Sequence, residues 1–456
     1  MNHPHKIKKF VLLLGDLAVL YLSLWLTLAI RYQSLPDSER WLSHVRPFSF
    51  IFILWVIIFY IANLYDLRQI SNSIAFWQRS LRSLLIAGAG AAIFFYILPD
   101  RNISPKTTLA IYLIVFALVF AFWRQFYHRA LAAYLPKISI GIIGYNEQIK
   151  EIIQEVSSRS QLGYRLSFII DENADTDINH EGQTIFSKHT NLAKLAAEQH
   201  PNIIVFTTTP HESIELRRSL FALLPQKINF ISLVHFYESL TGKVPISAIG
   251  ETWFLENLSE GSKGFFDQLK RFFDFTFALV FIIISSLLWP IIAIVIKLTD
   301  NGAVFFSQTR LGQNGEAFTI YKFRTMRTAK NDFAPTGQND NRITPFGNFL
   351  RKSRLDEIPQ LINIIKGEMS FVGPRPERPE LIKDLEQLVP FYQQRMLVKP
   401  GISGWDQVSG EYHSPSYEDT MKKLQYDLFY IKNRSYYLDL SIILKTIYTV
   451  LSRTGL

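Results

Sequence analysis

Four runs of apolar residues near the N-terminus constrain the fold of this chain more than any other feature. They cover residues 10–30, 48–65, 81–98 and 107–123, and each has about the length that a helix needs to cross a hydrocarbon core of about 30 Å. A basic N-terminus before an apolar run is also typical of a signal peptide. The first run, however, is longer than a usual signal sequence, lacks a small-residue cleavage site and is followed by three more. We therefore expect residues 1–130 to form four transmembrane helices.

The Lys and Arg residues of the short loops predict the orientation of these helices, because cytoplasmic loops carry the excess of positive charge. Nine of them fall on the side of the N-terminus, namely Lys6, Lys8, Lys9, Arg68, Arg79, Arg82, Arg124, Arg129 and Lys137. Five fall on the other side, namely Arg31, Arg40, Arg46, Arg101 and Lys106. Both ends of the bundle are therefore expected in the cytoplasm. Asp16 and Asp66, near the ends of spans, are interpreted as interfacial or inter-helix contacts rather than ion sites.

A fifth apolar run, residues 272–298, can be interpreted in two ways. If it crossed the membrane, the rest of the chain would leave the cytoplasm. Its basic flanks, which favour both ends on the same side, are Lys263, Lys270 and Arg271 before the run and Lys297, Arg310, Lys322 and Arg324 after it. Pro290 inside the run removes a helical hydrogen bond and favours a break. We expect residues 263–298 to form a re-entrant helical hairpin, and an ordinary kinked span stays the alternative.

Composition narrows the classes of function. The chain has 456 residues and no cysteine, which excludes disulfides, thiolate metal sites, iron–sulfur clusters and cysteine nucleophiles. Its formal net charge of +9 indicates nucleic acid, anionic lipid or an anionic substrate as a partner. The basic residues cluster around carboxylates and prolines rather than forming a stripe interleaved with aromatic residues, so we expect no nucleic acid.

Residues 138–256 alternate between strand-like and helix-like segments. The sequences ISIGIIG, RLSFIID, NIIVFTT and INFISLV are typical of strands, and helical stretches separate them. This rhythm predicts a Rossmann-like domain with a parallel sheet. Gly141 and Gly144 end the first strand, but the full glycine fingerprint of dinucleotide-binding folds is missing. A structural or regulatory role is favoured over nucleotide binding, which stays open.

A polar and basic C-terminal region contains an adjacent pair of carboxylates. In RLDEIPQLINIIKG, Pro359 is tolerated only in the first turn of a helix, so a helix is expected to begin near Asp356 and to end at Gly367. Asp356 is then an N-cap or first-turn carboxylate, which either only stabilises that helix or, with Glu357, is part of a site for a divalent metal and a phosphorylated substrate. Three cations that suit the second interpretation precede the pair, namely Arg351, Lys352 and Arg354. The residues alone leave both interpretations open.

Two further motifs present cations. In GPRPERPE, prolines on both sides of Arg375 exclude helix, so a stiff loop presents a planar guanidinium that suits a diphosphate. A proline-rich linker is the alternative. Lys322 and Arg324 of YKFRTM would share one face of a half-buried strand, either at a site or facing solvent. Trp405 of KPGISGW either packs on the core or stacks on a base.

Together, KFRTM, LDEIPQLINIIKGEMSFVGPRPE and KPGISGW resemble the motifs of the bacterial sugar transferase family. These proteins are polyprenyl-phosphate hexose-1-phosphate transferases, also called monotopic phosphoglycosyltransferases. The resemblance covers residues 263–456, and the N-terminal helices and middle domain resemble the large branch that serves exopolysaccharide, capsule or O-antigen assembly. It implies a re-entrant helix over 263–298 and a small cytoplasmic α+β catalytic domain over 299–456, on the surface of the bacterial inner membrane. Trp289 before Pro290 departs from the family's commoner pair of a small residue and proline.

The resemblance also implies a reaction. Asp356 would attack the β-phosphate of a UDP-sugar, release UMP and hold the sugar phosphate covalently until undecaprenyl phosphate accepts it. Glu357 would complete the pair and hold Mg²⁺ together with Asp356. The substrate-binding residues that the motifs imply are Lys322, Arg324, Arg351, Arg354, Arg375 and Glu377. Glucose is the expected sugar, with galactose or an N-acetylated sugar as alternatives, and the oligomeric state stays open, a homodimer included.

Two other classes of function stay open beside this enzyme. A polytopic transporter would place ionisable residues within the spans and repeat its fold around a midplane site, whereas these spans are nearly uncharged and show no repeat. A membrane-anchored nucleotide sensor built on residues 138–256 would need an intact phosphate loop. The resemblance therefore favours a multi-pass inner-membrane transferase, and the partners that it implies are a UDP-sugar, undecaprenyl phosphate and membrane lipid.

Overall fold

The structure of the chain is a computed structural model. It describes residues 3–65, 74–97, 105–131, 137–158, 162–180, 183–207, 213–258, 263–300, 302–327, 340, 342–409 and 416–452. Asp66, Arg68 and Arg101, used above, lie outside these residues. The chain forms two compact units, residues 1–241 and 242–456, and each is described by itself. The boundary falls inside the range predicted for the Rossmann-like domain, so residues 242–256 belong to the second unit.

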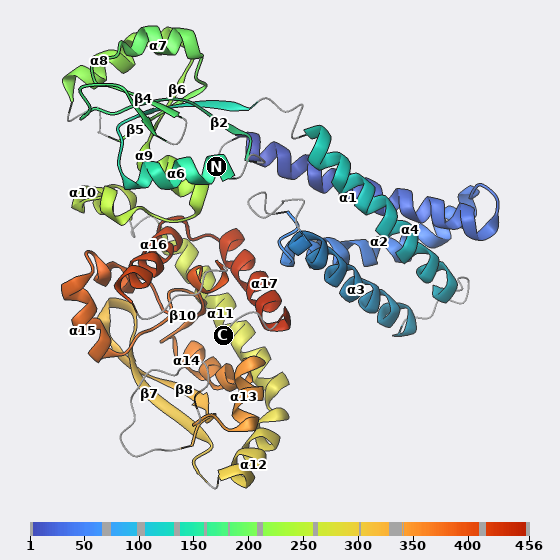
Figure 1. The fold of residues 1–456 in the computed structure, drawn as a ribbon. Coiled ribbons are helices and arrows are strands. Elements are labelled where there is room, and N and C mark those ends of the chain that lie inside the picture. The colour runs from blue at the N-terminus through green and yellow to red at the C-terminus, as the bar shows by residue number, and fades with distance from the viewer. Residues whose placement is uncertain are drawn as a thin grey trace. The chain divides into compact units, whose positions relative to one another are not determined.

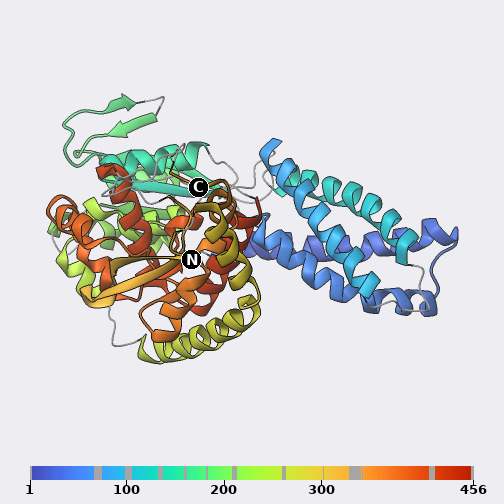
Figure 2. The ribbon, with the colours of Figure 1, turned by 90° about the horizontal axis from the view of Figure 1, so that it is seen from below.

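Four long apolar helices begin the first unit and lie side by side, as predicted (Figure 2). They are α1 His3–Tyr32, α2 Ser38–Ile61, α3 Ile74–Ile97 and α4 Pro105–Phe126. Each is long and apolar enough to cross a membrane. Asp37 caps α2 by accepting a hydrogen bond from the Arg40 amide at 2.8 Å, which explains why this helix begins before its apolar run.

A buried ion pair joins the first and last of these helices. Asp16 of α1 and Arg124 of α4 are both fully buried, with 2.5 Å between Oδ2 and Nη2. The indole of Trp123 also donates to Asp16 Oδ1 at 3.0 Å. Gly15 permits this close approach, because a Cβ at that position would lie 1.8 Å from the Trp123 ring. The interpretation of Asp16 as an inter-helix contact is therefore confirmed.

A six-stranded sheet follows in the first unit. Its strands are β1 Ile138–Ile143, β2 Tyr164–Ile170, β3 Ile178–His180, β4 Gln183–Phe186, β5 Ile203–Phe206 and β6 Asn229–Ser232. They lie in the order β3-β4-β2-β1-β5-β6, and all neighbours are parallel except β3 and β4. The four predicted strands are β1, β2, β5 and β6. The hairpin of β3 and β4 has no signal in the sequence, because its strands are short and mostly polar.

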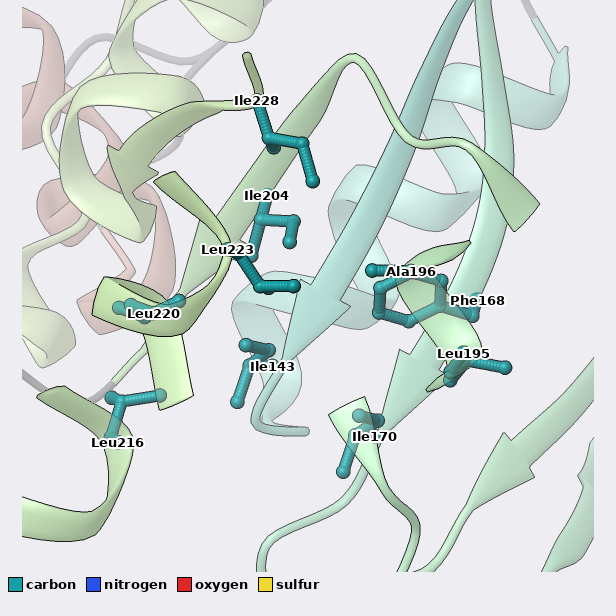
Figure 3. Close-up of a cluster of buried hydrophobic side chains, with 10 residues drawn as sticks. All are labelled: Ile143, Phe168, Ile170, Leu195, Ala196, Ile204, Leu216, Leu220, Leu223 and Ile228. Atoms are coloured by element: carbon teal, nitrogen blue, oxygen red, sulfur yellow. The ribbon is translucent and has the colours of Figure 1, made fainter. Parts of the chain in front are cut away.

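Helices cover both faces of this sheet. They are α6 Glu147–Ser158, α7 Leu192–Gln199, α8 Ile214–Ala222 and α9 Leu233–Thr241. Side chains of α7 and α8 pack with Ile143, Phe168 and Ile204 in one buried cluster (Figure 3), and α6 and α9 lie on the opposite face (Figure 1). Because β1 is covered on both sides, nearly all its residues are buried, which explains its continuous apolar sequence.

The fifth apolar run forms two helices of the second unit that meet at a sharp bend. α11 spans Gly264–Ser285, α12 spans Leu288–Asp300, and the bend between them is 60° (Figure 1). Pro290 lies in the first turn of α12, where its missing N–H costs no hydrogen bond. Ser286 Oγ donates to the Ile283 carbonyl at 2.7 Å and so satisfies a carbonyl at the end of α11. The bend therefore comes from one helix ending and another beginning.

Short strands and further helices complete the second unit. Its strands are β7 Phe305–Leu311, β8 Ala317–Phe323, β9 Ser370–Val372 and β10 Gly401–Ser403. Its other helices are α10 Glu251–Asn257, α13 Pro345–Lys352, α14 Leu361–Lys366, α15 Pro379–Leu388, α16 Tyr417–Asn433 and α17 Tyr436–Ser452, with the 3₁₀ helices η7 Leu355–Gln360 and η8 Tyr392–Leu397. β7 and β8 form an antiparallel hairpin, and β9 pairs with β10 in parallel. Ala278 of α11, Ile320 of β8 and Ile364 of α14 share one buried cluster, which places η7 beside the apolar helices.

Candidate active site

The adjacent carboxylates lie in η7, which leads directly into α14. The helical segment begins at Leu355 and ends before Gly367, whose φ of +88° is readily adopted only by glycine, so the predicted bounds are nearly correct. Arg354 rather than Asp356 occupies the cap position of η7. Asp356 is buried, and its Oδ1 accepts no hydrogen bond from any described residue. Asp356 is therefore a first-turn carboxylate, one of the two expected positions, and is not the N-cap.

Glu357 is held by two cations. Lys322 Nζ of β8 donates to Glu357 Oε1 at 2.6 Å, and Arg375 Nη2 donates to the same oxygen at 3.0 Å. The Glu357 side chain is only 6% exposed. Burial acts to raise the pKa of Glu357, but the charges of Lys322 and Arg375 outweigh burial and hold this pKa well below its usual range. Glu357 is thus an ionised carboxylate that orders two cations.

Asp356 has a different electrostatic environment. Burial and the adjacent charge of Glu357 raise the pKa of its carboxyl group to about 6, against the opposing charges of Lys322, Arg354 and Arg351. Buried polar atoms nearly always have a hydrogen-bond partner, whereas Asp356 Oδ1 has none among the described residues. A buried carboxylate with a perturbed pKa and an uncommitted oxygen is a candidate reacting group.

Arg375 is presented by a loop that two distant motifs build together. Gly373 and Gly401 meet where β9 pairs with β10, and a Cβ at Gly401 would lie 2.1 Å from the Gly373 nitrogen. The Gly401 amide donates to the Pro374 carbonyl at 3.0 Å, and the Gly373 amide donates to the Ser403 carbonyl at 2.9 Å. Only glycine permits this approach of the two backbones. The glycines of the GPRP and KPGISG motifs therefore support the Arg375 loop.

The buried ion pair of Arg395 and Asp427, which is not among the predicted site residues, also supports this loop. Arg395 of η8 donates from Nη2 to the Arg375 carbonyl at 3.0 Å and from Nη1 to the Tyr392 hydroxyl at 2.5 Å. It also pairs with Asp427 of α16, with 2.8 Å between Nη2 and Oδ2. The two side chains are 6% and 3% exposed. No local motif signals Arg395, because its partners come from other elements of the fold.

Arg351 and Arg354 lie at and just after the end of α13, close in sequence to Asp356. The charges of both act to lower the pKa of Asp356. Arg351 Nε also donates to Thr325 Oγ1 at 2.9 Å. Arg354 has φ +55° and ψ 15°, a left-handed conformation that is uncommon for a residue other than glycine. Its guanidinium forms no hydrogen bond or ion pair with any described residue.

Arg324 follows the end of β8 and contacts Gly302 and Met326. β8 ends at Phe323, so Arg324 does not share a strand face with Lys322. Its Nε donates to the Met326 carbonyl at 2.9 Å, and its guanidinium lies against Gly302. A role of Arg324 in substrate binding stays a prediction.

Glu377 also has partners away from the carboxylate pair. It lies 3.6 Å from both Arg310 and Lys423. Burial acts to raise the pKa of Glu377, but the charges of Arg395, Lys423 and Arg310 outweigh burial and lower it. The contacts of Glu377 anchor the end of the GPRPE loop, and its predicted role in substrate binding is not tested by them.

Trp405 belongs to the core of the second unit. It is 8% exposed and stacks on Phe429, with 5.8 Å between ring centroids. Its indole donates to the Gly242 carbonyl at 3.0 Å. Of the two predicted roles, packing is therefore confirmed.

A cavity of about 370 Å³ lies beside the carboxylate pair. Its lining is mostly apolar and includes side chains from α11, α12, η7 and α17. Arg354 and Glu357 are the charged residues of this lining. The arrangement thus combines an uncommitted carboxylate oxygen, ordered cations and an apolar cavity, which suits chemistry on a phosphate that carries an apolar group.

Comparison with known proteins identifies two matching families and several relatives. A bacterial sugar transferase family matches residues 265–453, and a CoA-binding domain family matches residues 60–224. The UDP-N-acetylgalactosamine-undecaprenyl-phosphate N-acetylgalactosaminephosphotransferase of Aeromonas hydrophila is 40% identical over 220 residues, 48% of this chain and 51% of that protein. The UDP-glucose:undecaprenyl-phosphate glucose-1-phosphate transferase of Xanthomonas campestris pv. campestris is 45% identical over 174 residues, 36% of each chain.

A third relative is shorter. The Uncharacterized sugar transferase EpsL of Bacillus subtilis is 39% identical over 195 residues, which are 41% of this chain and 90% of that protein. The chain therefore spans nearly all of this relative, but only about half of the Aeromonas protein and about a third of the Xanthomonas protein.

The described residues at the first helix after β1 do not fit the phosphates of CoA or a nucleotide. Folds with parallel sheets bind phosphate at the N-terminus of this helix. Here the Asn146 side chain accepts a hydrogen bond from the Ile149 amide at 3.0 Å. It thereby occupies one of the backbone N–H donors that a phosphate at this helix N-terminus would use. Glu147 in the first turn adds a negative charge, which opposes an anion at this position.

Proposed function

The chain belongs to the bacterial sugar transferase family, and we propose that it transfers a sugar phosphate from a UDP-sugar to undecaprenyl phosphate. The asymmetry of the carboxylate pair carries this proposal. Glu357 orders Lys322 and Arg375, while the buried Oδ1 of Asp356 has no partner among the described residues. A carboxylate oxygen beside ordered cations suits attack on a diphosphate. The names of the relatives support this donor and acceptor.

The reaction has two displacement steps. In the first, an oxygen of Asp356 forms a bond to the β-phosphorus of the UDP-sugar, and the bond from this phosphorus to the bridging oxygen breaks, so UMP leaves with the electron pair. In the second, a phosphate oxygen of undecaprenyl phosphate attacks the same phosphorus and releases the Asp356 carboxylate. Lys322 and Arg375 stabilise the negative charge that spreads over the phosphate oxygens in both steps.

Mg²⁺ is the proposed cofactor. Among the described residues there is no group of three His, Cys, Asp or Glu side chains that could hold a metal. Mg²⁺ is commonly bound by one or two carboxylates together with substrate phosphates, and Asp356 Oδ1 with Glu357 fits that arrangement. When bound, the ion would neutralise charge on the diphosphate. Turnover should stop in excess chelator and return with Mg²⁺, and full activity in chelator would exclude the metal.

The identity of the sugar is proposed from the large branch that the chain resembles. Glucose is the first candidate, and the relatives include transferases named for glucose and for N-acetylgalactosamine. Galactose stays an alternative. No described residue separates these sugars, so a panel of UDP-sugars must decide.

The proposed location is the bacterial inner membrane, with the second unit in the cytoplasm. The basic flanks of the fifth apolar run support a re-entrant hairpin of α11 and α12. The 60° bend between the two helices is what such a hairpin needs, because a straight helix of this length would cross. The Rossmann-like middle domain is proposed to have a structural or regulatory role.

A test of the proposed function measures the first step alone. The full-length protein in nanodiscs, given each UDP-sugar without undecaprenyl phosphate, should release up to one UMP per protein. The peptide containing Asp356 should gain the mass of a sugar phosphate. Asp356→Asn should abolish both signals, and Asp384→Asn on the exposed face of α15 is the matched control. Sugar phosphate on another residue, or normal turnover by a folded Asp356→Asn protein, would refute the covalent step.

A further inference from the structure

Three hydroxyl side chains that line the cavity beside the carboxylate pair donate to carbonyls of their own helices. Thr446 and Thr449 of α17 each donate their hydroxyl to a carbonyl of their own helix, at 2.8 and 3.0 Å. Ser285 of α11 donates in the same way at 3.3 Å. Such hydroxyls are already satisfied within the helix. These three side chains therefore add little polarity to the cavity.

The two charged residues that line the cavity, Glu357 and Arg354, differ in whether their side chains are paired. Glu357 is paired with Lys322 and Arg375 at 2.6 and 3.0 Å. Arg354 has no hydrogen bond or ion pair with any described residue. It is a permanently charged planar group that can hold a phosphate through two parallel hydrogen bonds. The cavity thus joins an apolar volume to a cation that is available for an anion.

We infer that this cavity binds the first isoprene units of the lipid acceptor and that Arg354 binds its phosphate. This inference rests on the proposed function and divides the cations between the two substrates. Arg354 serves the acceptor, and Lys322 and Arg375 serve the donor.

The origin of the cavity walls supports a lipid. Phe281, Ile284 and Leu288 come from α11 and α12, the bent pair that is apolar enough for a membrane. The volume of about 370 Å³ is within the usual range of ligand sites, about 300–1,000 Å³. It is much smaller than a whole undecaprenyl chain, so the rest of the chain stays in the bilayer.

Photocrosslinking tests the inference without turnover. A prenyl phosphate with a photoreactive group on the isoprene unit next to the phosphate is added to the full-length protein in nanodiscs. Labelled peptides should contain residues 281–288 or 446–450, and undecaprenyl phosphate should prevent the labelling. Label confined to other segments would overturn the inference, and so would equal protection by added phosphatidylglycerol. A protein that releases no UMP but labels here would refute only the proposed function.

Filling the cavity gives a kinetic test. Thr449→Phe should raise the KM for undecaprenyl phosphate about tenfold or more, because it places a ring in the space of the isoprene units. The KM for the UDP-sugar should change less than about twofold, because the donor does not enter the cavity. Ile447→Phe is the matched control, since Ile447 is 43% exposed on the same helix and does not line the cavity. An unchanged KM for the acceptor in folded Thr449→Phe would overturn the inference.

Discussion

The half-buried Lys322 and the buried Glu357 form an ion pair, with 2.6 Å between Nζ and Oε1, that joins strand β8 to helix η7. Arg375 contacts the same carboxylate oxygen at 3.0 Å. One carboxylate of the adjacent pair is thereby committed to two cations, and its neighbour Asp356 keeps an oxygen without a partner among the described residues. The two carboxylates differ in their partners although they are adjacent in the chain.

The ion pair predicts a coupled loss of stability. Lys322→Met should lower the free energy of unfolding by about 3 kcal/mol, because a buried carboxylate loses one of its cations. The double variant with Glu357→Gln should lose less than the sum of the single variants, by about 0.5–3 kcal/mol. Denaturant unfolding in detergent micelles measures each value. Lys352→Met, at an exposed position, should have little effect, and additive losses would contradict the coupling.

The pKa of Asp356 predicts how the first reaction step depends on pH. Burial and Glu357 raise this pKa to about 6, and a carboxylate must be ionised to attack. The rate of UMP release without acceptor should therefore increase as pH rises through about 6. A rate that does not change between about pH 5 and pH 7 would be inconsistent with an Asp356 nucleophile.

Stability should change with pH in the opposite direction. The folded protein holds the Asp356 proton more tightly than the unfolded chain, because its pKa is raised from 3.8 to about 6. This contribution to stability is complete below the unfolded pKa and is lost as pH rises through the folded pKa. Asp356→Asn should remove this part of the pH dependence, as thermal unfolding over the same pH range would show.

The left-handed backbone of Arg354 predicts different effects of two substitutions. Its φ of +55° costs nothing for glycine and about 1 kcal/mol for alanine. Arg354→Gly should therefore be more stable than Arg354→Ala by about 1 kcal/mol, while both should lose turnover with undecaprenyl phosphate because both lack the guanidinium. Equal stability of the two variants would indicate that this backbone conformation carries no strain.

The Arg395–Asp427 pair predicts a positioning role. Arg395→Lys keeps the charge, but a lysine cannot reproduce the planar donor geometry that reaches Tyr392 and the Arg375 carbonyl. Turnover should fall about tenfold or more, because Arg375 is less well positioned. The KM for undecaprenyl phosphate should hardly change. Lys383→Arg, at an exposed position of α15, should behave like the wild type, and so would Arg395→Lys if its role were only to keep Asp427 paired.

Single cysteines in this cysteine-free chain test the membrane topology. Gly264→Cys and Ser307→Cys flank the bent pair of helices, and both should react with an impermeant thiol reagent only from the cytoplasmic side. Ser34→Cys, between α1 and α2, should react only from the other side. Ser307 is exposed, and a side chain at Gly264 meets no neighbour, so neither change disturbs packing. Labelling of the first two from opposite sides would show that the helices cross.

Much of this protein follows from local properties of the sequence. The length of an apolar run and the alternation of strand-like and helix-like segments are local, so the four N-terminal helices, the strands β1, β2, β5 and β6, and the helical segment after Arg354 are all predictable. The β3–β4 hairpin is not, because its strands are short and polar. The order and spacing of the C-terminal motifs likewise indicate the family without any coordinates.

Only the tertiary structure decided which carboxylate is paired with cations and which keeps an oxygen without a partner among the described residues. Lys322 comes from β8, Arg375 comes from the β9 loop, and Arg395 supports that loop from η8. No pattern within a short window contains these contacts, because residues far apart in the chain make them. The sequence by itself could name Asp356 and Glu357 as a pair and could identify the cations around them. Their different roles arise from burial and from which cation reaches which oxygen, and both are properties of the folded chain alone.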